Sequence, residues 1–177
     1  MLVKRKQTIT KYALTTALVV AIAGLSSTAF AATATSNLPV SADVSASCTI
    51  DASAGVAFGQ YDPIVTHVSA DLTGSGTIST TCTNGFTATL TLGQGANSDT
   101  GSTDAAPLRR MLSGTTDYLS YKLFTDAGLT TEWNNTVGTT VDGTGAPVST
   151  TVYGSIAAAQ NVAVGSYADT VVATVTF

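Results

Sequence analysis

The chain ends in the stretch Gly165-Ser-Tyr-Ala-Asp-Thr-Val-Val-Ala-Thr-Val-Thr-Phe177, which decides the fold class. From Tyr167 onward the odd-numbered side chains fall on one face, and the even-numbered side chains, rich in threonine, fall on the other. This two-residue period predicts a half-buried β-strand. An apolar strand edge with free N–H and C=O groups recruits other chains. We therefore expect this edge to be covered by something that does not follow it in the sequence.

Short strand patterns separated by turn residues run through the rest of the chain. No 3.6-residue period continues for three turns beyond residue 31, which argues against helices. The pattern predicts an all-β sandwich. We expect loops at residues 93–107 and 138–147, and strands at residues 38–48, 67–72, 77–83, 86–92, 108–112, 118–124 and 150–156.

The dipeptide Asn84-Gly85 is the strongest local turn signal, and it suggests a two-residue hairpin. In such a hairpin, however, Cys82 would share a face with the threonines of the following strand, while Leu90 pointed the other way. If the chain instead crosses between the two sheets of a sandwich here, both strands can face one core. We therefore predict a crossing.

The N-terminus has the pattern of a secretory signal peptide. Basic residues at 4–6 and 11 precede an apolar run at 13–25, and the small-residue site Ala29-Phe-Ala31 follows. The apolar run is shorter than the roughly 20 residues of a spanning helix, so we expect cleavage after Ala31 rather than a membrane anchor. The remaining chain would carry three basic and eleven acidic side chains, a net charge of −8. This balance argues against nucleic-acid or anionic-lipid partners.

The two cysteines, Cys48 and Cys82, both lie in the part predicted to be exported. An oxidising compartment would pair them in a disulfide, and two buried free thiols are the alternative.

The sequence offers no set of residues for catalysis or metal binding. His67 is the only histidine and has no neighbouring ligand, so we interpret it as a surface or strand residue. Glu132 is the only glutamate, and the aspartates are scattered singly. Trp133 near two tyrosines suggests a sugar site, but core packing is the more common role. We expect no enzyme activity, no catalytic or metal site, no cofactor and no small-molecule substrate.

Several stretches together resemble a known family. They are the signal peptide, the alternating segment before Ser47-Cys-Thr49, the second cysteine in Ile78-Ser-Thr-Thr-Cys82, Val152-Tyr-Gly-Ser-Ile-Ala157, and the Gly-x-Tyr-x-Asp-x-hydrophobic ending. In these stretches the chain resembles the spore coat protein U family, the family of the Csu-type archaic chaperone–usher pilins. The resemblance covers essentially the whole exported chain and is loose at residues 93–147.

The resemblance implies an incomplete immunoglobulin-like β-sandwich that lacks its last strand and is completed by donor-strand exchange. It divides the chain into a signal peptide (1–31), an N-terminal donor-strand extension (32–44) and a pilin domain (45–177). The implied donor side chains are Leu38, Val40, Ala42 and Val44. The implied groove and chaperone-contact residues are Tyr167, Val171, Ala173, Val175 and Phe177. Pro39 and the small Ala42 depart from a regular donor, which leaves the depth and extent of insertion open.

The implied function is a structural subunit of an adhesive pilus, or fimbrium, that supports surface attachment and biofilm formation. Its implied partners are a periplasmic pilus chaperone, an outer-membrane usher, and other copies of itself or related pilins. The protein would be exported through the periplasm to the cell surface or secreted, and its single-domain length favours a shaft subunit. The alternative is a self-complemented secreted coat protein that folds its own N-terminal strand into the groove and does not polymerise. A small extracellular hydrolase is a third interpretation, but the sequence lacks the catalytic groups that such an enzyme needs.

Overall fold

The computed structural model describes residues 31–177, so the predicted signal peptide lies outside the described residues except for Ala31. Residues 42–177 form one compact unit. Every regular element of the described part is a β-strand, and none of its segments is a helix long and apolar enough to cross a membrane. The prediction of an all-β fold is confirmed. The strands are β1 (Cys48–Asp51), β2 (Val56–Ala57), β3 (Leu72–Cys82), β4 (Thr87–Leu92), β5 (Arg110–Ser113), β6 (Asp117–Ser120), β7 (Lys122–Phe124), β8 (Thr139–Asp142), β9 (Pro147–Ile156) and β10 (Ala173–Thr176).

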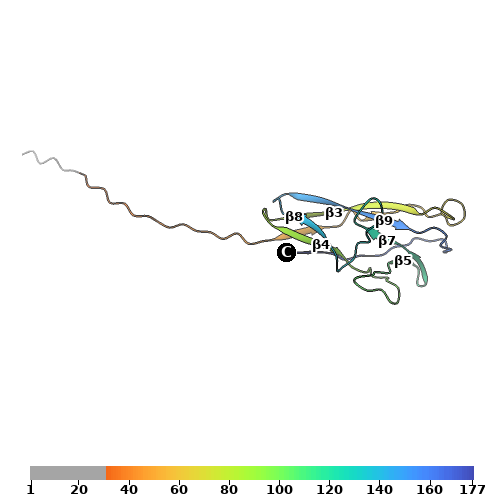
Figure 1. Ribbon diagram of the computed structural model, residues 1–177. Coiled ribbons are helices and arrows are strands. Elements are labelled where there is room, and N and C mark those ends of the chain that lie inside the picture. Colours follow the sequence, from red (N-terminus) through yellow and green to blue (C-terminus); the bar gives the residue numbers. More distant parts are fainter. Residues whose placement is uncertain (1–30) are drawn as a thin grey trace, which may run out of the picture. The chain divides into compact units, whose positions relative to one another are not determined.

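Two antiparallel sheets make up most of the domain (Figure 1). The first has the order β1-β3-β9-β7, with β2 pairing on β3 beyond the end of β1, and the second has the order β10-β4-β8. The longest pairing joins β3 to β9, from Leu72 opposite Ile156 to Thr81 opposite Pro147. Strands β5 and β6 form a separate hairpin. The core lies between the two main sheets, where Ile78 and Val152 from the first meet Leu90 and Val141 from the second around the fully buried Trp133.

The chain crosses from one sheet to the other at Asn84-Gly85, as predicted. Strand β3 belongs to the first sheet and β4 to the second. Cys82 and Leu90 are consequently both buried in the same core. Gly85 has a positive φ of 93°, which glycine adopts without the steric cost of a side chain.

The prediction of a loop at residues 138–147 is wrong, because β8 occupies its first half. Val141 is buried opposite Ala88 of β4, and this pairing orders a stretch that its glycines had marked as irregular. The predicted strand at 118–124 also divides, since β6 pairs with β5 while β7 pairs with β9. Leu119, Tyr121 and Leu123 are buried on one face of this stretch, and Phe124 on the other face is buried as well.

The prediction of a strand at residues 67–72 is also wrong, and so is the interpretation of His67 as a surface or strand residue. Residues 63–70 are a loop of turns and bends, and His67 is buried within it. Its backbone N–H donates to the Asp62 carbonyl at 2.8 Å, its Nδ1 accepts from the Asp62 N–H at 3.0 Å, and its ring stacks on Tyr61. His67 therefore closes the loop at residues 62–67 by bonding back to Asp62.

The predicted strand at residues 38–48 is not present before Cys48. Residues 31–47 have no regular secondary structure, and all of them are exposed. A strand needs a partner for its N–H and C=O groups, and an alternating apolar pattern predicts one only where a neighbouring chain segment supplies that partner.

Candidate donor segment and acceptor groove

A continuous groove runs between the edge of the first sheet and the terminal segment of the chain. Its inner part, about 400 Å³, lies between residues 52–58 and residues 167–173. Its outer part, about 650 Å³, lies between residues 56–63 and residues 162–167. Both parts are lined by Val56, Phe58, Met111 and Tyr167, so they form one channel along the domain. Strands β1 and β10 are the edge strands on its two sides.

The terminal segment forms one wall of this groove, and its regular strand is shorter than predicted. Only Ala173–Thr176 forms β10, which pairs with β4. Farther back a single bridge joins Ala168 to Leu112, with N–O distances of 2.9 and 3.1 Å. The predicted alternation persists along the whole wall, because the odd positions from 167 to 175 are half-buried and the even positions are exposed.

The structure brings together some of the predicted groove residues and not others. Tyr167, Val171 and Ala173 line the groove. Val175 is half-buried on β10 opposite Leu90 but does not line it. Phe177 is exposed and packs against Phe86, with ring centroids 6.2 Å apart.

The opposite wall contains two residues that sequence reasoning did not identify, Val56 and Phe58. The ring of Phe58 meets Tyr121 edge to face at 6.0 Å and lies over Gly154 of β9. A Cβ at Gly154 would come 2.6 Å from Cζ of this ring, so only glycine leaves room for the phenylalanine. The short apolar stretch at residues 56–58 was the available signal, but its position beside the terminal segment depends on contacts distant in sequence.

One partly buried polar cluster holds the terminal segment against the loop that follows β4. The Asp169 carboxylate accepts hydrogen bonds from the Tyr121 hydroxyl at 2.7 Å and from Asn97 N and Nδ2 at 3.1 and 3.0 Å. Burial raises the pKa of Tyr121 far above its usual value, and the hydrogen bond to Asp169 adds to this effect. The aspartate of the terminal Gly-x-Tyr-x-Asp motif is thus a structural anchor for the groove wall. Tyr167 of the same motif donates to the carbonyl of Ala163 at 2.8 Å.

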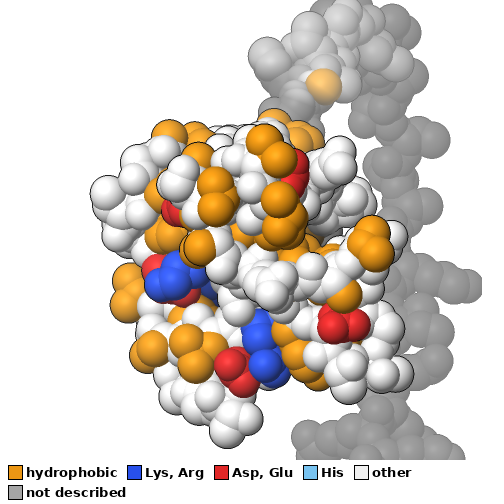
Figure 2. All heavy atoms as spheres, turned by 90° about the vertical axis from the view of Figure 1, so that its right-hand side faces the viewer, with side chains coloured by type: hydrophobic (Ala, Val, Ile, Leu, Met, Phe, Trp, Pro, Cys, Tyr) orange, Lys and Arg blue, Asp and Glu red, His pale blue; other side chains and the backbone are white. Residues whose placement is uncertain are grey.

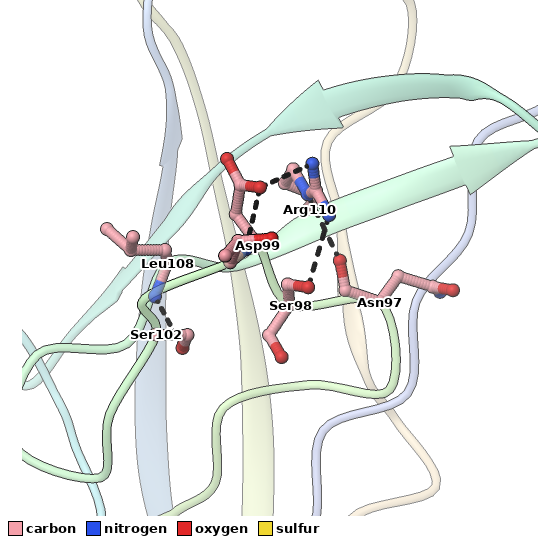
Figure 3. A network of polar contacts seen from close by, with 7 residues as sticks. Asn97, Ser98, Asp99, Ser102, Leu108 and Arg110 are labelled. Atoms are coloured by element: carbon pink, nitrogen blue, oxygen red, sulfur yellow. Dashed lines mark hydrogen bonds and ion pairs between the residues drawn. The ribbon is translucent and has the colours of Figure 1, made fainter.

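Two neighbouring arginines fix the loop at residues 93–107, and neither is free at the surface. Arg109 is buried and donates to the carbonyls of Leu92, Gly93 and Trp133 at distances of 2.7–3.2 Å. This burial lowers the pKa of Arg109. Arg110 donates to the carbonyls of Asn97 and Ser98 and forms a 2.8 Å ion pair with Asp99, as Figure 3 shows. The two guanidinium groups therefore hold the loop at residues 93–107 in place through its backbone carbonyls and Asp99.

The proposed donor side chains are exposed in the single chain. Leu38, Val40 and Val44 have 85%, 88% and 85% of their surfaces accessible, and Ala42 is exposed as well. Such exposure of three aliphatic side chains on one face of an extended segment is unusual for a surface that meets only water.

The first strand begins directly after this segment, at Cys48. Cys48 and Cys82 are opposite each other in β1 and β3 and are joined by a disulfide, which confirms the predicted pair. No cysteine of residues 31–177 is free. Within the same residues no group of three potential metal ligands occurs.

Comparison with known proteins identifies the family. The model of the "Spore Coat Protein U domain" matches residues 34–174. "Protein U" of Myxococcus xanthus is 48% identical over 159 residues, which cover 85% of this chain and 89% of that protein. A chain in the crystal structure of the CsuC–CsuE chaperone–tip adhesion subunit pre-assembly complex, from the archaic chaperone-usher Csu pili of Acinetobacter baumannii, has a similar fold. That match has a TM-score of 0.54 at 18% identity and covers 76% of this chain and 40% of the other. The chain therefore belongs to the spore coat protein U domain family, a family of structural, non-enzymatic proteins.

Proposed function

We propose that the protein is a structural subunit of an archaic chaperone–usher adhesive pilus and polymerises by donor-strand complementation. The observation that carries this proposal is the pairing of two features. One is an open groove between β1–β2 and the terminal segment, and the other is an exposed apolar segment of matching period in the same chain. Strand addition at an edge combines main-chain hydrogen bonds with pockets for alternate side chains. The fold is then an immunoglobulin-like sandwich whose last strand comes from another subunit.

The donor segment has enough apolar side chain for a stable insertion. Burial of an aliphatic side chain contributes about 1.5–3 kcal/mol. Leu38, Val40 and Val44 start almost fully exposed, so nearly all of this gain is realised on insertion. The half-buried Tyr167 and Val171 of the groove wall would lose their remaining water contact in the same step.

A groove of this kind needs a cover before assembly, because apolar edge strands aggregate. We propose a periplasmic pilus chaperone as that cover, and an outer-membrane usher as the site where the next subunit replaces it. The similarity of the fold to a chain from a chaperone–subunit complex supports the chaperone. The exported fibre would support surface attachment and biofilm formation.

A second candidate is a self-complemented coat protein, and the spore-coat identity of the matched family model favours it. In that case residues 32–44 would fold back into the groove of their own chain. The two functions differ in assembly state. A fibre gives a ladder of multimers on unheated gels that collapses on heating, whereas the self-complemented protein runs as a monomer in both lanes.

A pair of charge substitutions tests the donor assignment. We expect Val40→Asp to abolish the heat-labile ladder, because burial of an unpaired carboxylate in an apolar groove costs several kcal/mol. Ser41→Asp adds the same charge one residue away, on the opposite face of an extended segment, and should leave the ladder intact. The measurement is the amount of surface-exposed, heat-labile polymer at matched periplasmic subunit levels. Equal polymer from both variants rules out this register, and loss with Ser41→Asp alone shifts it by one residue.

A further inference from the structure

The end of the sandwich that carries the loop before β3 and the loop after β9 has an unusually apolar surface. Four aliphatic side chains, which we call the distal patch, are Ile64, Val65, Val68 and Val164, and all are exposed. Ile64 and Val65 have 76% and 73% of their surfaces accessible. Figure 2 looks onto this end of the molecule, and hydrophobic side chains gather across the upper part of the face.

The distal patch is held in place by a defined network of hydrogen bonds. The Asp62 carboxylate accepts from the N–H groups of Ile64 and Val65 at 2.9 and 3.1 Å, and these bonds lower the pKa of Asp62. The His67 carbonyl accepts from Ala159 N at 2.8 Å, which joins the loop before β3 to the loop after β9. The Tyr61 hydroxyl also bonds to the second loop, at Ala157 and Gln160. The aliphatic side chains are therefore presented by a fixed scaffold.

The outer part of the groove opens at the distal patch. Two residues line this part of the groove there. Pro63 directly precedes Ile64 and Val65 in the chain, and Val164 belongs to the distal patch itself. The terminal segment passes along the groove from residue 162, at this end, to Ala173 and then to Phe177 at the opposite end. Cys48 also lies at that opposite end, because it pairs with the last residue of the eleven-residue strand β3.

A donor strand in the groove has a direction that can be argued from the fold. Every strand pair of residues 31–177 is antiparallel, and antiparallel pairing is slightly more stable per residue. A donor antiparallel to the terminal segment enters at the Phe177 end and finishes at the distal patch. A parallel donor would finish instead where the acceptor's own Ser47 leaves the domain, bonded to Thr83, and would crowd that exit.

The linker between donor and domain is short. Only Ser45, Ala46 and Ser47 separate Val44 from Cys48, so these two residues can be at most about 14 Å apart. When Val44 of one copy lies at the outer end of the groove, the first strand of that copy must begin beside the distal patch. The end that arrives there carries the aromatic pair Phe86 and Phe177, whose rings are in contact at a tilt.

From this geometry we propose that the distal patch is a contact surface for a second copy of this chain, against which the Phe86–Phe177 end of the donating subunit is seated. The inference rests on the proposed function, since the donor segment brings the second copy to this position. It adds a contact between globular domains to the strand insertion itself. This contact covers the aliphatic side chains and restricts the angle between successive subunits.

The test compares two engineered cysteines in assembled fibres. Val65→Cys places a thiol in the distal patch, and Val137→Cys places one on a valine of similar exposure, 68%, in the loop between β7 and β8. The measurement is the rate of labelling by a maleimide in intact fibres, normalised to total labelling after heat dissociation. We expect Val65→Cys to label at least ten times more slowly than Val137→Cys in the fibre. Equal rates in fibres that give the normal ladder overturn the distal contact and leave donor-strand exchange standing.

A double substitution to aspartate tests the same contact independently, through the stiffness of the fibre. We expect Ile64→Asp with Val65→Asp to keep the heat-labile ladder but to give fibres whose persistence length in electron micrographs falls several-fold. Val137→Asp is the matched control and should keep the persistence length of the unmodified fibre. Unchanged stiffness in the double variant contradicts the proposal, as does loss of its ladder, which would assign the loop to insertion itself. Failure of the unmodified protein to form any ladder contradicts the proposed function instead.

Discussion

Tyr121 connects the core to the wall of the groove through a single hydroxyl. Its ring is buried beside Phe58, and its hydroxyl donates to Asp169 on the terminal segment. A hydrogen bond to a charged acceptor contributes about 1.5–3 kcal/mol, more than one between neutral groups. The position of the terminal segment therefore depends on a residue that it meets only in the folded state.

We expect Tyr121→Phe to lower the free energy of unfolding by about 1.5–3 kcal/mol at neutral pH, since Asp169 loses a buried donor. The folded-state pKa of Tyr121 is raised above the usual value of about 10. Its contribution is therefore complete below pH 10 and is lost as the pH rises above 10 towards the folded-state pKa. Urea unfolding from pH 7 to pH 11 should show a steeper alkaline loss in the unmodified protein than in the variant. Tyr118→Phe, which removes a partly exposed hydroxyl, is the control, and equal costs for the two variants would contradict the assigned role.

At the scale of elements, the local periodicity predicted which side chains face inward. The alternation at residues 167–175 and the burial of Leu119, Tyr121 and Leu123 follow from the two-residue period of a strand, which needs no knowledge of the neighbours. Strand boundaries depend on pairing with distant segments. For this reason β8 was predicted as loop, and β10 was predicted as longer than it is.

The candidate site was predictable to the same degree. The odd-numbered side chains of one groove wall and the apolar face of the donor segment were visible in the sequence. The second wall was not, because Val56 and Phe58 reach the groove only by packing across β3 and β9. Similarly, the aliphatic loop around His67 reads as a strand until its bonds to Asp62 and Ala159 are known.

A substitution at Gly154 of β9 tests how far the groove depends on the absence of a side chain beneath the Phe58 ring. A methyl group at this position would displace the Phe58 ring, and overpacking of this kind costs about 1–3 kcal/mol. We expect Gly154→Ala to lower the urea midpoint and to reduce the heat-labile ladder, because Phe58 lines both parts of the groove and a displaced ring would narrow it. Adding Phe58→Leu should restore part of both. Thr151→Ala, on the exposed face of the same strand, is the control and should leave the ladder intact, and an equal loss of the ladder there would contradict a role of Gly154 in the groove.

At the scale of the whole molecule, the disulfide closes the chain from Cys48 to Cys82, which contains β1, β2 and β3, into a covalent loop. Cys48 and Cys82 are separated by 34 positions, and closure of such a loop stabilises the folded state by roughly 4 kcal/mol in the chain-entropy model. We expect the double variant Cys48→Ser, Cys82→Ser to lose most of this free energy of unfolding. Urea denaturation with and without reductant is the measurement. Reductant should destabilise the unmodified protein and leave the variant unaffected, and an unchanged midpoint in the variant would contradict a stabilising role.

The position of that disulfide also determines how the molecule carries mechanical load. Residues 32–47 lead directly into Cys48, so tension applied to this extension enters the domain at the first residue of β1. Without a cross-link, the four residue pairs between β1 and β3 would carry this load alone. The bond to Cys82 passes the force directly into β3 as well, which is held by ten residue pairs to β9. A single covalent bond at the entry point thus spreads the load from a four-pair ladder onto a ten-pair one.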